Sequence, residues 1–101
     1  MEISTDGPTL RLSGDFDVRS TREARTAIYD LLGRYDHVVV DLTEVSTIDV
    51  TALKVLAVAT RTASHEGHHL TLRGCGPAVR RLLHLSRLIR VVEVERAAAT
   101  A

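Results

Sequence analysis

Three aspartates and one threonine are the residues of this 101-residue chain whose types and spacing point most directly to chemistry. Asp15 and Asp17 lie in the stretch GDFD, and Asp49 comes shortly before Thr51 at the start of an apolar run. An acid followed by a hydroxyl at a helix N-terminus is typical of a helix cap. These four residues are therefore candidates for one small functional surface.

Each candidate also has a structural interpretation. Thr51 is either a modified hydroxyl or a plain helix N-terminal residue, and the second is favoured because hydroxyls often cap helices. Asp49 is a good N-cap whatever the function. Asp17 either caps the helix that follows, in competition with Ser20, or supports contact with a partner. Val50 either packs under its loop as a hydrophobic staple or is exposed as an apolar contact.

Two other stretches contain metal-ligating or nucleophilic side chains. HEGHH holds three histidines, but Gly67 breaks the helix between them, and His68 and His69 point opposite ways on a strand, so we expect no metal site. Cys75 lies between a strand and a helix N-terminus, and the following helix offers a base only about two and a half turns along. We therefore expect no metal, no cofactor and no enzymatic activity.

Composition limits the fold and the class of partner. With 101 residues and 45% hydrophobic side chains, the chain fits one small domain. Its 13 basic and 13 acidic residues give no net attraction to nucleic acid or to an anionic membrane, which favours a protein partner. The chain has one cysteine and no N-terminal signal pattern, and its apolar runs fall far short of the roughly 20 residues of a membrane span. We expect a cytoplasmic protein that does not insert into a membrane.

The hydrophobic pattern predicts the elements that position these side chains. The expected order is strand, strand, helix, strand, helix, strand, helix and strand, at residues 2–5, 9–13, 21–32, 37–42, 50–65, 69–73, 77–86 and 91–95. This order predicts a single α/β domain over residues 1–96, with a mixed sheet of four or five strands and three or more helices packed on it. The alanine-rich residues 97–101 are expected to form a flexible tail.

Several local signals support these boundaries. HVVVDL, with three consecutive valines, is typical of a strand buried on both faces, and we expect it at the centre of the sheet. Ser20 and Glu23 have capping-box spacing for the first helix, and Gly33 and Gly67 are suited to end the first two helices. The second helix is apolar on more than one face. It is therefore either wedged between neighbours or exposes a partner surface.

In a sheet of this kind, loops at the carboxyl ends of the strands collect functional groups. GDFD enters the first helix and VSTID enters the second, so both loops are expected at one edge. Asp17 and Asp49 are then expected to face each other across neighbouring strand ends.

These stretches together resemble the STAS domain of bacterial anti-sigma factor antagonists. GDFD is similar to the family's Gly-x-[Leu/Phe]-Asp turn, and VVVDLTEV is similar to its strand and following loop. Asp-Val-Thr-Ala-Leu stands where members carry Asp-Ser-Ser/Thr-Gly-Leu, and GCGPAVRRLLHLSRLIRVVEV resembles the family's closing strand, helix and final strand. The resemblance spans Leu10 to Val94.

The resemblance implies an anti-sigma factor antagonist, which binds a kinase-like anti-sigma factor and frees a sigma factor for transcription without contacting DNA. Relatives are phosphorylated at the serine that follows the aspartate, and this chain has Val50 there. Thr51 is then the remaining candidate for phosphorylation, and Ala52 stands in the place of the glycine. A phosphate adds about −1.5 to −2 charges and is expected to release the partner by repulsion.

The surface implied for the partner consists of seven residues: Asp15, Asp17, Asp49, Val50, Thr51, Ala52 and Lys54. The alternative is a non-phosphorylated STAS scaffold, or the cytosolic subunit of a signalling or membrane transport complex.

Overall fold

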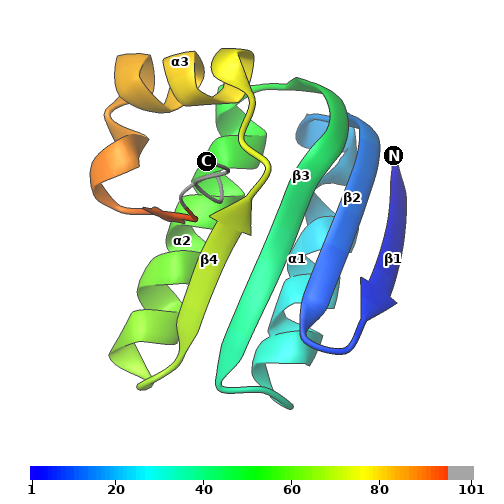
Figure 1. Ribbon diagram of the computed structural model, residues 1–101, viewed down its shortest axis with the longest axis vertical. Coiled ribbons are helices and arrows are strands. Elements are labelled where there is room, and N and C mark those ends of the chain that lie inside the picture. The colour runs from blue at the N-terminus through cyan, green and yellow to red at the C-terminus, as the bar shows by residue number, and fades with distance from the viewer. Residues whose placement is uncertain (96–101) are drawn as a thin grey trace, which may run out of the picture.

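Five strands form one sheet in the order β1-β2-β3-β4-β5 in the computed structural model, which describes residues 1–95 (Figure 1). The strands are β1 (Glu2–Asp6), β2 (Thr9–Phe16), β3 (His37–Ile48), β4 (His69–Arg73) and β5 (Glu93–Val94). β1 runs antiparallel to β2, and the remaining neighbours are parallel. The predicted α/β domain with a mixed sheet is confirmed, and the predicted tail at 97–101 lies outside the described residues.

Three helices connect the parallel strands: α1 (Thr21–Leu32), α2 (Val50–His65) and α3 (Pro77–Ser86). Two short 3₁₀ turns, η1 (Val18–Ser20) and η2 (Leu88–Arg90), precede α1 and follow α3. The helix bounds agree with the prediction, because each helix has an apolar stripe and glycines follow the first two. Within residues 1–95, no helix has both the length and the apolar character needed to cross a bilayer.

The helices α1 and α2 lie side by side behind the sheet, and β1 to β4 lie in front of them (Figure 1). The fully buried apolar side chains between the two layers include Leu10, Leu12, Phe16, Ala24, Ile28, Val38, Val40, Leu53, Leu56, Ala59, Leu70 and Leu72. Burial of this apolar surface is the main favourable term in folding and fixes the register of the strands.

The central strand β3 differs from its prediction in two respects. Val38, Val40 and Leu42 are buried, but Val39 and Asp41 between them are only half-buried, so the strand is covered on one face and not on both. The helices pack on a single face of this sheet, and the opposite face carries mainly polar side chains. β3 also continues six residues past its predicted end, because residues 44–48 pair with the last residues of β2.

The capping box predicted for α1 is wrong. The side chain of Ser20 makes no capping hydrogen bond, and its hydroxyl donates instead to the backbone carbonyl of Asp15 at 3.4 Å. The turn η1 runs directly into α1, so Ser20 already has near-helical backbone angles (φ −104°, ψ −3°) rather than the extended ones of a cap. The hydroxyl of Thr21 satisfies the carbonyl of Val18 at 3.0 Å.

Candidate functional site

The two acidic loops meet at one edge of the sheet, as predicted. β2 and β3 are parallel neighbours, and their last residues pair as Asp15 with Thr47 and Phe16 with Ile48. Phe16 is fully buried, which anchors the end of β2 in the core. The chain leaves β2 through Asp17 and leaves β3 directly before α2, so both loops project from adjacent strand ends.

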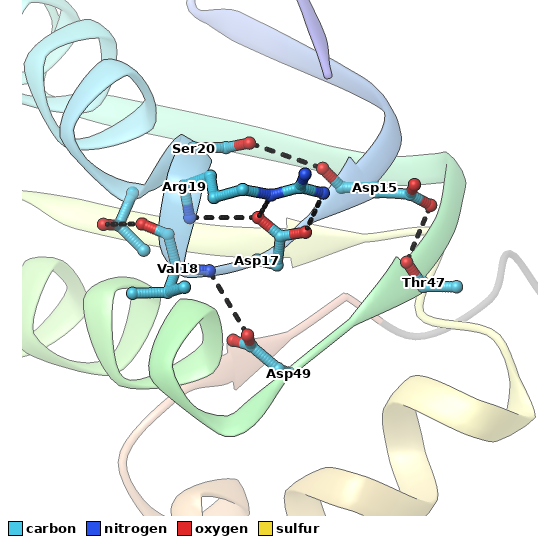
Figure 2. Close-up of polar contacts among 8 residues, drawn as sticks. Asp15, Asp17, Val18, Arg19, Ser20, Thr47 and Asp49 are labelled. Carbon is cyan, nitrogen blue, oxygen red and sulfur yellow. Dashed lines mark hydrogen bonds and ion pairs between the residues drawn. The ribbon is translucent and has the colours of Figure 1, made fainter.

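Asp49 connects the two loops through its carboxylate (Figure 2). Oδ1 accepts the backbone N–H of Ala52 at 2.8 Å, which makes Asp49 the N-cap of α2. Oδ2 accepts the backbone N–H of Val18 at 3.2 Å, from the loop after β2. The backbone N–H of Asp49 also donates to the carbonyl of Phe16 at 3.3 Å. The predicted cap is confirmed, and the same side chain fixes the position of one loop against the other.

Asp17 is held within its own loop. It caps η1 by accepting the backbone N–H of Arg19 at 3.0 Å, and it pairs with the Arg19 guanidinium, where Nη2 lies 2.8 Å from Oδ2. The hydrogen bonds from the guanidinium and then from the backbone N–H of Arg19 hold the pKa of Asp17 below its ordinary value of 3.8. Asp17 therefore carries a charge that is already partly neutralised by Arg19.

Asp15 is exposed and links the ends of the two strands. Its Oδ1 accepts the hydroxyl of Thr47 at 2.8 Å, a contact between β2 and β3 that also appears in Figure 2. This contact and the hydrogen bond that the backbone N–H of Val18 donates to Asp49 join the two loops into one continuous surface.

Two valines are exposed on this surface. Val18 follows Asp17 and is 60% exposed, and Val50 follows Asp49 and is 37% exposed. Exposed valines next to polar groups that are already hydrogen-bonded are typical of a protein contact surface. Of the two interpretations of Val50, the structure supports an exposed apolar contact.

The other predicted surface residues divide into two groups. Ala52 is fully buried, so its side chain is not part of any surface. Lys54 and Thr51 are exposed, and both line a hollow between α1 and α2, together with Arg25. Thr51 does not cap α2, because Asp49 occupies the capping position two residues earlier.

A third loop, Gly74–Gly76, lies at the carboxyl end of β4 and is built differently. Gly74 has a φ of +73°, and a Cβ placed on it would lie 2.8 Å from the backbone nitrogen of Thr43, so only glycine fits. Cys75 is buried, and its burial raises the pKa of the thiol above its ordinary value of 9.0. A thiol in this environment is a poor nucleophile.

Three site residues were not identified from the sequence: Val18, Arg19 and Thr47. Val18 and Thr47 form hydrogen bonds with residues that are distant in the sequence. Arg19 binds its neighbour through a loop conformation that hydrophobic periodicity does not describe. The spacing of Asp17 and Arg19 was the one available signal, because an aspartate often accepts the N–H two residues further on.

Residues 1–93 match the model of the family described as "Mlab, STAS domain". Among solved structures, the chain is similar to a Thermotoga maritima protein assigned as an anti-sigma factor antagonist, with a TM-score of 0.77 and 20% identity over 97% of this chain and 87% of the other. It is also similar to the anti-sigma factor antagonist SpoIIAA of Bacillus, with a TM-score of 0.71 and 15% identity over 96% and 88% of the two chains.

A third similar structure has a different description. It is a sulfate transporter family protein of Wolinella succinogenes, with a TM-score of 0.66 and 16% identity over 85% of this chain and 73% of the other. At these identities, the solved structures establish a shared fold.

Proposed function

Because this chain belongs to the STAS domain family, we propose that it is an anti-sigma factor antagonist. It would bind an anti-sigma factor with a kinase-like ATPase domain and so release a sigma factor, in the bacterial cytoplasm and without contacting DNA. The Asp49 carboxylate carries this proposal, because it holds the loops after β2 and β3 together as one surface.

The proposed contact surface is built from these two loops. Val18 and Val50 supply exposed apolar area, and Asp15, three residues before Val18, supplies an exposed carboxylate. When a partner covers these valines, the free-energy cost of removing water from the neighbouring acids is small. The carboxylates of Asp17 and Asp49 keep their hydrogen bonds within the protein. We therefore expect the two valines to contribute most of the binding energy.

The switch that the resemblance implies would be altered in this chain. SpoIIAA is known in an unphosphorylated and a phosphorylated form. Valine has no hydroxyl, so Val50 cannot accept a phosphate. A phosphate on Thr51 would lie beside Arg25 and Lys54, which line the same hollow, and these cations would neutralise part of its charge. We therefore propose an antagonist that binds its partner constitutively.

The proposal is tested by recovering partners of the tagged protein from its native host. Wild type is expected to recover a protein with a kinase-like ATPase domain. Val50→Asp places a negative charge where relatives carry the phosphate and is expected to weaken recovery at least about tenfold. Leu85→Asp is the matched control, since Leu85 is 72% exposed on α3, and it is expected to bind as wild type does.

Phosphorylation is tested separately. The protein is incubated with the recovered ATPase and ATP, and any phosphate is located by mass spectrometry. No phosphate together with retained binding supports the constitutive antagonist. A phosphate on Thr51 that releases the partner would contradict it.

A second function, a subunit of a membrane transport complex, is favoured by the likeness to the sulfate transporter family protein. In that case the same purification would recover transporter subunits in place of an ATPase of the kinase-like class. That result would reject the antagonist and support the second function.

A further inference from the structure

The outward faces of α1 and α2 form a groove that the two acidic loops do not include. The helices lie side by side on the sheet (Figure 1). A hollow of about 300 Å³ is lined by residues of both helices. Its lining consists of Arg25, Tyr29, Thr51, Lys54, Val55 and Val58. The lining residues span about two turns of α2 and one turn of α1, so the hollow extends along both helices.

The groove is positively charged although the whole chain is neutral. Arg25 lines it from α1 and Lys54 lines it from α2. Arg22 is exposed and lies one turn before Arg25 on α1. Within residues 1–95, none of these three cations takes part in an ion pair. The sequence of α2 also contains no acidic residue.

Apolar side chains lie between the cations. Val58 is 59% exposed and Tyr29 is 36% exposed, on opposite sides of the hollow. Thr51, Lys54 and Val58 follow one another at intervals of three and four residues, so they form one stripe along α2. Most of the Val58 side chain is open to solvent in the middle of the helix, so it is available for a contact.

We propose that this groove binds an acidic amphipathic helix of a protein partner. A helix packs into the groove between two others through side chains at intervals of three and four residues. Its apolar stripe would cover Val58 and Tyr29, and carboxylates on both sides of that stripe would meet Arg25 and Lys54. The cations lie on both walls of a concave surface, which fits a narrow helix better than a flat membrane.

The length of the partner helix follows from the groove. The lining along α2 runs from Thr51 to Val58, which is seven residues or about 10 Å. A partner helix of about two turns therefore covers it. Thr51 and Lys54 also border the surface proposed for the anti-sigma factor, but this inference does not depend on the partner being one.

The inference is tested with a synthetic helix of about 16 residues that has leucines on one stripe and glutamates on both sides of it. Binding to the ¹⁵N-labelled full chain is measured by NMR, and affinity by fluorescence anisotropy. The expected result is a shift of amide signals on α1 and α2. The double variant Arg25→Glu and Lys54→Glu should bind at least about tenfold more weakly.

A matched control separates the groove from general charge effects. Arg81→Glu with Arg90→Glu changes the net charge of the protein equally but on exposed residues outside the groove, and it should bind the peptide as wild type does. A peptide with the same composition in scrambled order should not bind. Equal weakening by both double variants, or equal binding of the scrambled peptide, would overturn the proposal.

Two further measurements test whether something other than an acidic helix occupies the groove. Vesicles of phosphatidylglycerol that bind through Arg25 and Lys54, when the peptide does not bind, would identify a membrane surface instead. A photo-crosslinker at Val58 of the full chain in its native host should attach to an acidic helical segment. Attachment to a neutral or basic segment would contradict the proposal for the groove. This outcome is independent of whether the protein is an anti-sigma factor antagonist.

Discussion

The loops at the carboxyl edge of the sheet are held in two different ways. The loops after β2 and β3 are fixed by carboxylates that accept hydrogen bonds, through Asp15, Asp17 and Asp49. The loop after β4 is fixed by close packing, because Gly74 lies against Thr43 and Cys75 is buried. The carboxylates fix their loops while leaving Val18 and Val50 exposed, whereas in the loop after β4 the one side chain that packing could expose, that of Cys75, is buried. The first arrangement suits a binding surface, and the second suits a structural connection.

The largest effect is expected at the packed loop. Gly74→Ala introduces a Cβ close to the backbone of Thr43 and forces alanine into positive φ, so it should lower the free energy of unfolding by about 2–4 kcal/mol. Gly76→Ala is the matched control. It has negative φ and no atom within 4 Å of the added Cβ, and should cost less than about 1 kcal/mol. Urea unfolding measures both, and equal costs would contradict the packing explanation.

A smaller effect is expected at the hydrogen-bonded loops. Asp49→Ala removes the N-cap of α2 and the link to Val18, and should lower the free energy of unfolding by about 1–2 kcal/mol. Asp49→Asn keeps an acceptor for the backbone N–H of Ala52 and should lose about half as much. An equal loss of unfolding free energy in both variants would mean that the charge of Asp49, and not its capping hydrogen bond, is responsible.

A pH-dependent effect is expected at Asp17. Because the folded pKa of Asp17 lies below 3.8, its stabilising contribution is fully present above that value and is lost as the pH falls through the folded pKa. Wild type should therefore be more stable than Asp17→Asn near pH 7, and this difference should shrink as the pH falls below 3.8. Arg19→Gln should raise the pKa of Asp17 toward 3.8, as followed by NMR titration. An unchanged pKa in that variant would contradict the assignment to Arg19.

The smallest effect is expected at Thr47. Thr47→Val removes the hydroxyl that donates to Asp15 but keeps a β-branched side chain on the exposed end of β3, so the cost should be under about 0.5 kcal/mol. The free energy of partner binding should fall by more than the free energy of unfolding does, because Asp15 loses its fixed orientation. Unchanged binding would show that Asp15 does not depend on Thr47 for its position.

Much of the architecture could be predicted from the sequence, because apolar periodicity depends on local spacing. The helices at 21–32, 50–65 and 77–86 were predicted at their observed bounds, and Asp49 was recognised as a cap. The capping box at Ser20 was not observed, because the 3₁₀ turn before α1 changes the backbone angles there. Turns of this kind are set by tertiary contacts and leave no periodic pattern.

The sequence by itself determined the order of the elements, the carboxyl-edge position of the acidic loops and the absence of a hydroxyl at Val50. These follow from side-chain chemistry and from spacing along the chain. Only the tertiary structure decided that β3 is covered on one face, that Asp49 bonds to the loop containing Val18, and that Thr51 lies beside Arg25 and Lys54. The reason is physical: each of these depends on how segments far apart in the sequence pack together, and packing follows from the whole core.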